Sequence, residues 1–146
     1  MEKKTAEISA TSFSLEQLNL QAQHTLIGHL GFRYTNVSSG RIEATMPVDE
    51  YTCQPFGLLH GGASLALGET LAGVGSMLLC DTDEIAVGIQ VSGNHVSSVR
   101  KGDTVHAVAT LVHHGCSSHV WNVDIFSSAD RLVSSIRIVN SVLKKR

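Results

Sequence analysis

The chain has 146 residues, 42% of them hydrophobic, and a formal net charge of −2, which is enough for one domain with a substantial core. This balance excludes bulk electrostatic attraction to nucleic acid or to an anionic membrane. No apolar run approaches the roughly 20 residues that span a bilayer, and the start lacks the apolar core of a signal peptide. Three widely spaced cysteines indicate reduced thiols, so we expect a cytoplasmic protein.

The N-terminal region predicts a loose segment followed by one helix. Residues 1–13 are polar, and we expect them to be flexible. Ser14, with Gln17 three residues later, has the spacing of a capping box at a helix start. An apolar stripe then extends this helix to about His29.

Two strands and a long helix are expected next. The stretch 32–37 is extended in character, and 41–46 alternates polar and apolar residues as a half-buried strand does. The turn 38–40 joins them. After an irregular stretch with two prolines, a nearly uncharged run predicts a helix over roughly 59–79.

The last part of the chain predicts four strands, separated by turn signals. This order of elements indicates an α+β fold, in which an antiparallel sheet packs its apolar face on the long helix. No repeat or linker divides residues 14–146, so we expect a single domain. The four predicted strands lie at about 85–97, 103–114, 118–127 and 132–143.

The long helix has two different faces when its residues are placed 100° apart. We expect the bulky stripe to lie on the sheet, and the small stripe to let another backbone come close. The bulky stripe is Leu67, Leu71, Val74 and Leu78. The small stripe is Gly62, Ala66, Glu69, Gly73 and Ser76.

Glu69 is the only Asp, Glu, Lys or Arg between Glu50 and Asp81. A solvated helix face usually carries several charges, so a catalytic acid held away from bulk water is favoured over a plain surface residue. At the helix start, His60, Gly61 and Gly62 expose backbone where negative charge binds. An acid together with an oxyanion-binding turn suits acyl hydrolysis.

His60 and Glu69 are nine positions apart, which corresponds to about 13.5 Å and two and a half helical turns. Their side chains would therefore point to opposite sides of one helix. We expect a homodimer to solve this problem. Gln54, His60 and Gly61 would come from one subunit, and Glu69 from its neighbour.

Residues 54–69 read QPFGLLHGGASLALGE, and 88–96 read GIQVSGNHV. Over 14–143 the chain resembles the hotdog-fold acyl-CoA thioesterases, in the branch that acts on aryl and hydroxyaryl thioesters such as 4-hydroxybenzoyl-CoA or 1,4-dihydroxy-2-naphthoyl-CoA. It also resembles the proofreading thioesterase of enterobactin synthesis. The resemblance implies a central helix wrapped by a five- to six-stranded antiparallel sheet. It further implies a homodimer with shared sites, a tetramer, and no metal or redox cofactor.

The resemblance also assigns roles to residues. Glu69 would be the nucleophile or the general base, while Gln54 and His60 would orient the thioester or the attacking water. The Gly61 N–H would polarise the thioester carbonyl. By the same resemblance, substrate-binding residues would include Gly62, Asn94 and His95. By strand parity, His95 would share a face with Val87, Ile89 and Val91.

Three positions depart from the family pattern: Gly73 lacks a hydroxyl, and Ser97 and Cys116 stand where basic residues are usual. Basic side chains there would suit the phosphates of coenzyme A. The candidates to compensate are Arg100, Lys101 and Arg137. Two alternatives follow: a thioesterase for carrier-protein-bound acyl groups, and a hotdog protein that binds acyl-CoA without turnover.

Four potential metal ligands cluster around one turn, but their spacing matches no common zinc pattern. We expect a solvated turn there and no metal site. These residues are His113, His114, Cys116 and His119.

Overall fold

A computed structural model describes residues 13–146 and contains three helices and six strands within that range. The segment predicted to be flexible lies outside the described residues, apart from its last residue. Every predicted strand, and the long helix, is present within two residues of its predicted bounds. The elements are α1 (Leu15–Ala22), α2 (Leu26–His29), β1 (Arg33–Ser38), β2 (Arg41–Pro47), α3 (Gly61–Met77), β3 (Glu84–His95), β4 (Thr104–His114), β5 (Ser118–Phe126) and β6 (Leu132–Lys144).

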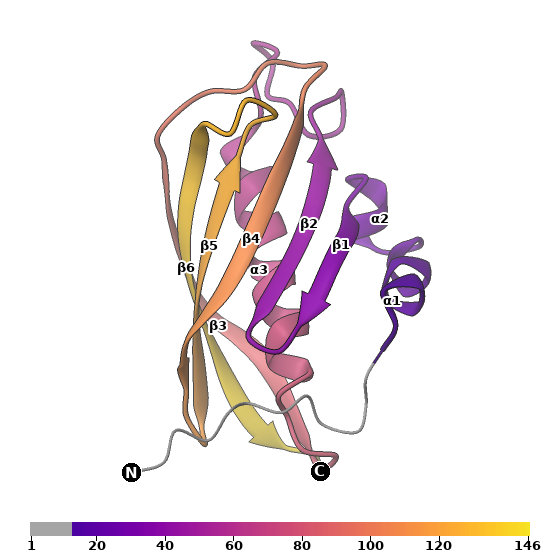
Figure 1. The fold of residues 1–146 in the computed structure, drawn as a ribbon, viewed down its shortest axis with the longest axis vertical. Helices are drawn as coiled ribbons and strands as arrows, with labels where there is room; N and C mark the ends of the chain where they lie inside the picture. Colours follow the sequence, from indigo (N-terminus) through magenta and orange to yellow (C-terminus); the bar gives the residue numbers. More distant parts are fainter. Residues whose placement is uncertain (1–12) are drawn as a thin grey trace.

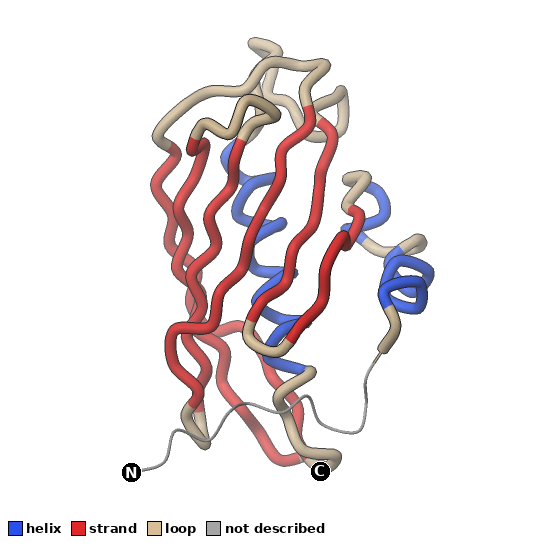
Figure 2. Tube along the Cα trace, viewed as in Figure 1, coloured by secondary structure: helices blue, strands red, loops and turns tan. Residues whose placement is uncertain are grey.

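The six strands form one antiparallel sheet in the order β1-β2-β4-β5-β6-β3. The sheet curves around α3, while α1 and α2 lie beside β1 (Figures 1 and 2). The predicted α+β architecture is confirmed. None of the helices in the described part of the chain has the length and apolar character needed to cross a membrane.

The N-terminal helical region consists of two short helices, not the single helix predicted. Ser14 caps α1 together with Gln17, as its sequence indicates. The chain then turns, and Thr25 precedes α2. A methyl group on Gly28 would lie 2.4 Å from the carbonyl oxygen of Ala22, so α2 folds back tightly onto the end of α1. A side chain at residue 28 would not fit this close approach, which glycine allows.

Helix α3 presents its bulky stripe to the sheet as predicted, with Leu67 and Leu71 fully buried and Leu78 nearly so. Ser76 belongs to the small stripe, which was predicted to let another backbone come close. It is fully buried because β6 reaches that side of the helix, where the Asn140 side-chain amide donates to Ser76 Oγ at 2.9 Å.

Trp121 is the largest fully buried side chain of the described residues, and its ring packs on a glycine of α3. A methyl group on Gly75 would lie 2.5 Å from Cη2 of the indole ring. The indole N–H donates to Ser76 Oγ at 2.8 Å, which fixes the ring in its plane. The ring therefore packs against bare helix backbone.

We expect Gly75→Ala to lower the free energy of unfolding by about 1–3 kcal/mol, because the added methyl overpacks the indole ring. Urea denaturation followed by circular dichroism measures this change. In a Trp121→Phe background the outer ring atoms are gone, so the further cost of Gly75→Ala should fall below about 1 kcal/mol. Equal costs in both backgrounds would contradict this packing.

The β4–β5 turn is only partly solvated, which corrects the prediction. His113, His114 and Cys116 are exposed, but His119 is 2% exposed because alternate residues of β5 face α3. Burial lowers the pKa of His119, and the neighbouring His114 lowers it further. Within residues 13–146 these four side chains do not converge on one point that could hold a metal ion.

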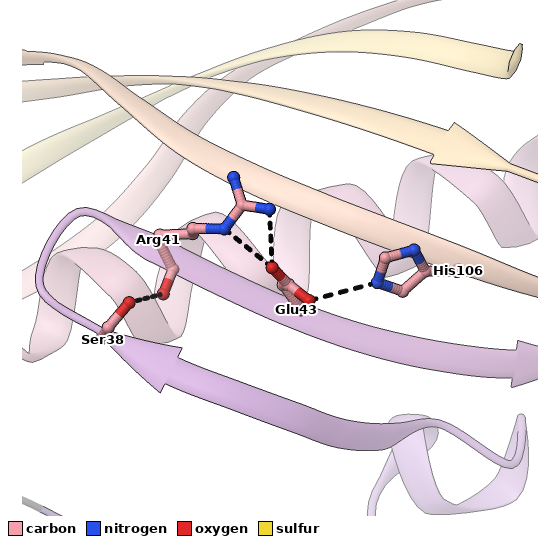
Figure 3. Close-up of polar contacts among 4 residues, drawn as sticks. All are labelled: Ser38, Arg41, Glu43 and His106. Atoms are coloured by element: carbon pink, nitrogen blue, oxygen red, sulfur yellow. Dashed lines mark hydrogen bonds and ion pairs between the residues drawn. The ribbon is translucent and has the colours of Figure 1, made fainter. Parts of the chain in front are cut away.

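The outer face of the sheet, opposite α3, carries charged pairs. Glu43 lies between Arg41 and His106, with Arg41 Nη2 at 2.7 Å and His106 Nε2 at 3.3 Å from its carboxylate oxygens (Figure 3). Burial acts to raise the pKa of Glu43, but the hydrogen bonds from Arg41 and His106 outweigh it and hold the pKa below its usual value.

The two edges of the sheet differ. At the β1 edge, the Asn19 side chain accepts a hydrogen bond from the Tyr34 backbone N–H at 2.8 Å and donates to its carbonyl at 3.0 Å. Burial also raises the pKa of Tyr34 to about 12. At the other edge β3 is twelve residues long and leaves Val87 and Ile89 exposed, the latter by 63%. Long apolar edges of this kind tend to pair with another strand.

Candidate active site

The first turn of α3 lies at the end of the molecule where three loops gather. These loops are the β2–α3, β3–β4 and β5–β6 connections, and they meet at the top of Figures 1 and 2. The backbone joins two of them directly, because the Leu59 N–H donates to the carbonyl of Val99 at 2.8 Å. Residues distant in sequence are thereby held around the N-terminus of α3.

His60 is the N-cap of α3, and its ring is fixed by the helix it caps. Its Nδ1 accepts the Gly62 backbone N–H at 2.8 Å, so the proton of the neutral ring lies on Nε2. The His60 backbone N–H donates to the carbonyl of Thr52 at 2.8 Å. The remaining ring N–H is a donor available to a bound group.

Gly61 offers the backbone donor that was predicted at the helix start. The amides of Ala63 and Ser64 donate to the His60 carbonyl, whereas the Gly61 amide has no acceptor among residues 13–146. It therefore combines a free N–H with the positive end of the helix dipole. This is the geometry that binds an oxyanion.

The ring of His95 lies directly against Gly61. A methyl group on Gly61 would lie 2.6 Å from His95 Nε2, so a larger residue would displace this ring. The other ring nitrogen, Nδ1, is 2.8 Å from Ser134 Oγ on β6. The structure thus brings together His60, Gly61 and His95, as the sequence predicted, and adds Ser134, which the sequence did not indicate.

A bulge in β3 changes which side chains share a face. The register with β6 shifts between Gly88 and Gln90, so Ile89 is an extra residue. Gly88 and His95 both face α3, although seven positions separate them. The predicted parity of His95 with Val87 is therefore wrong. By alternation Asn94 points away from the face that carries His95.

Gln54 lies in the loop that precedes α3. Its side-chain oxygen accepts the Phe56 backbone N–H, and its own backbone N–H donates to the carbonyl of Leu58 at 2.8 Å. This turn brings Gln54 into the segment that leads to His60. Phe56, in the middle of this turn, is 88% exposed.

Glu69 lies two turns further along α3, on its exposed face. Its carboxylate extends over β3, where a methyl group on Gly88 would lie 2.7 Å from Glu69 Oε1. Within one subunit Glu69 is exposed, and its removal from water in a homodimer stays a prediction. Eight residues separate it from Gly61, which on a helix is about 12 Å.

A polar cavity of about 450 Å³ lies beside the β3–β4 loop and is lined by three cationic residues: Arg100, Lys101 and Arg131. Arg131 was not predicted, since it stands alone in a polar turn. Its guanidinium donates to the carbonyl of Ser98 at 2.9 Å. Arg137, by contrast, is exposed between the buried residues of β6, so it lies on the outer face of the sheet.

A second, apolar cleft of about 320 Å³ opens between α2 and the first turns of α3. Its position next to His60 and Gly62 makes it the apolar space adjoining the oxyanion-binding turn. The residues that α2 and the β2–α3 loop contribute to this cleft were not predicted to line a binding site. They are Leu26, Leu30, Tyr51 and Cys53, and α3 adds Ala63 and Ala66.

Comparisons with known proteins find related sequences. The sequence profile of the thioesterase superfamily matches residues 56–134. The chain is 39% identical over 130 residues to the 1,4-dihydroxy-2-naphthoyl-CoA hydrolase of Escherichia coli, covering 89% of this chain and 95% of that protein. It is 40% identical over 130 residues to the proofreading thioesterase EntH of Cronobacter turicensis, covering 89% and 94%.

A solved structure shares the fold. The crystal structure of a thioesterase from Haemophilus influenzae superposes with a TM-score of 0.89 at 37% identity, covering 94% of this chain and 96% of the other. Its similarity spans both α3 and the whole sheet, because nearly all of the chain is matched.

Proposed function

The chain belongs to the thioesterase superfamily and is a thioester hydrolase, and we propose that its substrates are acyl-CoA thioesters with aromatic or hydroxyaryl acyl groups. The observation that carries the proposal is the geometry of the first turn of α3. There the Gly61 N–H is free, and the His60 ring caps the helix through Nδ1, which fixes its neutral tautomer. A thioester carbonyl placed there would meet a fixed dipole as negative charge develops on its oxygen.

Glu69 supplies the acid–base or nucleophilic group, from the neighbouring subunit. Attack by its carboxylate on the thioester would give an anhydride that water opens, and activation of water by the same carboxylate would give the same acid. Gln54 and His60 orient the reacting groups beside Gly61. The distance of about 12 Å between Gly61 and Glu69 within one helix supports a site shared by two subunits.

The exposed edge of β3 supports the dimer that such sites need. Within residues 13–146, only the β1 edge of the sheet is covered by a neighbouring helix, and the β3 edge carries the exposed Val87 and Ile89. Antiparallel pairing of two copies of β3 would satisfy the backbone hydrogen-bonding groups of both edges. The two copies would then be related by a two-fold axis. It would also bring the partner toward the exposed face of α3 and exclude water from Glu69. Two such dimers would form the tetramer.

The apolar cleft between α2 and α3 supports an aromatic acyl group. Leu26, Leu30 and Tyr51 offer an apolar wall directly beside the turn that holds the carbonyl. Small residues on α3, Ala63 and Ala66, leave room for a flat ring. An acyl group bound there would place its thioester carbon next to Gly61. Pockets of mixed apolar lining and few polar groups commonly bind small ligands in this way.

The polar cavity supports coenzyme A over a carrier protein as the thiol portion. Arg100, Lys101 and Arg131 gather positive charge where the nucleotide phosphates could lie, although Asp103 lines the same cavity and Lys101 is also 3.8 Å from Glu50. Charge-assisted hydrogen bonds to phosphate are among the stronger polar contacts. The alternative substrate is a carrier-protein thioester, which lacks the adenosine phosphates and is favoured by the uncharged side chains of Ser97 and Cys116.

We expect the protein to hydrolyse 4-hydroxybenzoyl-CoA with kcat/KM at least about tenfold above the same acyl group on pantetheine, because the phosphate contacts are then used. The rate is measured from the loss of thioester absorbance. A reagent that detects the released thiol is avoided, because it would also react with the exposed Cys116. A panel with fatty acyl-CoAs and an aryl-loaded carrier protein completes the comparison.

Two results would contradict the proposal. A fatty acyl-CoA hydrolysed faster than every aryl ester would remove the aromatic specificity. Equal rates for CoA, pantetheine and carrier-protein esters would remove the nucleotide contact. An Arg131→Gln variant with an unchanged KM for CoA esters would exclude Arg131 from that contact.

A further inference from the structure

Ser134 is a buried residue of β6 whose hydroxyl group contacts one side chain. The residue is fully buried, and it is the direct partner of His95 in the β3–β6 register. Its Oγ lies 2.8 Å from His95 Nδ1, and its side chain has no other hydrogen-bond partner among residues 13–146. The hydroxyl and the ring therefore depend on each other for this hydrogen bond.

The direction of this hydrogen bond follows from the burial of Ser134. A neutral imidazole has one nitrogen that donates and one that accepts, and a hydroxyl can do either. If Nδ1 carried the ring proton, it would donate to Ser134, and the buried hydroxyl proton would have no acceptor, which is costly. If Ser134 donates to Nδ1, both groups are satisfied. The neutral ring of His95 therefore carries its proton on Nε2.

Nε2 of His95 lies close to the free backbone amide of Gly61. A methyl group on Gly61 would be 2.6 Å from Nε2, and by standard bond lengths it would be about 2.5 Å from the Gly61 nitrogen. The two nitrogens are thus at most about 5 Å apart. One oxygen beyond the end of the helix, where the Gly61 N–H points, can accept hydrogen bonds of about 2.9 Å from both.

His60 has the same arrangement at this turn. Its Nδ1 accepts the Gly62 backbone N–H, so its ring proton also lies on Nε2. In both rings a donor occupies Nδ1, and within the described part of the chain Nε2 has no partner. The Gly61 amide and the two rings therefore offer three N–H donors. Such a set suits an oxygen on which negative charge develops.

We propose that Ser134 is a positioning residue that holds His95 in the Nε2–H tautomer, so that His95 is a second donor to the thioester oxygen beside Gly61. Negative charge grows on this oxygen as the carbonyl carbon becomes tetrahedral, and a donor already in place stabilises that state. Without Ser134 the other tautomer becomes accessible, and its Nε2 lone pair would repel the oxygen. This inference rests on the proposed function of the first turn of α3.

The tautomer can be measured without any activity. In a proton–nitrogen NMR spectrum of the full-length protein with isotope-labelled histidine, at mildly alkaline pH, protonated and unprotonated ring nitrogens give well-separated signals. The signals of His95 are those that disappear in His95→Gln. We expect a proton on Nε2 in the native protein, and a mixture that contains the Nδ1–H form in Ser134→Ala.

Ser134→Ala should also slow the reaction. For an aryl-CoA ester kcat should fall about tenfold, which is less than the loss of about 10²–10³ on removal of an oxyanion donor, because the ring itself remains. KM should stay within about twofold of native. Ser134→Thr keeps a hydroxyl at the same place, so it should keep the Nε2–H signal and at least about half of native kcat.

Ser135→Ala is the matched control for this substitution. Ser135 is the next residue of β6, so it faces the other side of the sheet, where its Oγ donates to Asp124 Oδ1 at 2.7 Å. The same hydroxyl is removed from the same strand, but no histidine loses a partner. We expect kcat within about twofold of native and unchanged His95 signals.

A double-substitution cycle separates positioning from a purely structural role. In a His95→Ala background there is no ring for Ser134 to orient. Adding Ser134→Ala should then change kcat by less than about twofold. A serine that only supports the fold would lower kcat by the same factor in both backgrounds.

The outcomes also separate this inference from the function on which it rests. A proton on Nδ1 of His95 in the native protein, an unchanged kcat in Ser134→Ala, or equal losses with and without the His95 ring would each overturn it and leave the hydrolase intact. Absence of turnover in the native protein would overturn the proposed function and the donor role of His95 together, even if the spectrum shows the Nε2–H tautomer.

Discussion

Glu69→Gln is expected to lower kcat for aryl-CoA hydrolysis by about 10²-fold or more, the scale of losing a general base or a nucleophile. Glutamine preserves the size of the side chain and its position over Gly88, so the fold and the proposed dimer should be unaffected. The amide cannot accept a proton from water at neutral pH and is a poor nucleophile. Steady-state kinetics on the purified variant measures the loss.

Glu43→Gln provides the matched control for this substitution. Glu43 is on the outer face of the sheet, where it contacts Arg41 and His106. The same chemical change there removes charge pairs without approaching α3, and kcat should remain native. Near-native turnover in Glu69→Gln would exclude this residue as the reacting group and leave the first turn of α3 without its partner.

Mixed dimers of Glu69→Ala and Gln54→Ala subunits are expected to regain about a quarter of native activity, although each variant alone is inactive. Random pairing at equal amounts makes half of the dimers mixed, and each mixed dimer contains one intact site of two. The reason is that, in the proposed dimer, Gln54 and Glu69 of the same chain serve different sites. Co-expression with two affinity tags, followed by mass spectrometry, establishes the amount of mixed dimer.

A pairing of Gln54→Ala with His60→Ala controls for nonspecific recovery. Both residues precede α3 in the same half of the proposed site, so each site of that mixed dimer keeps one defect. No activity should return. Equal recovery in both mixtures, or none in either despite verified mixing, would contradict a site built from two subunits.

The fold was predictable because its signals are periodic. Alternation in the strands and the bulky stripe of the long helix depend on local sequence, and both were confirmed. Features that depend on contacts between distant residues were not visible. Examples are the close approach of Gly28 to Ala22, where α2 folds back on α1, and the hydrogen bond from Asn140 to the buried Ser76. The bulge at Ile89 likewise reversed the parity expected for Val87.

The candidate site was predictable where one continuous motif holds it. His60 and Gly61 lie in such a motif, and the structure gives Gly61 the free N–H that the sequence suggested, whereas the cap formed by His60 was not predicted. Ser134 and Arg131 reach the site only through strand pairing and loop packing, so no local pattern marks them. A glycine inside a strand does signal a close approach by another group, and Gly88 could have been found by that rule.

Asn19, far from the proposed site, acts on strand pairing at the β1 edge of the sheet. Its side chain occupies the backbone N–H and carbonyl of Tyr34, so a strand from another molecule cannot use these two groups. In the proposed dimer β3 pairs with β3 of the partner, and both β3 edges are then used. A short polar side chain on the opposite edge would thus favour a closed pair over strand pairing that continues into a fibre.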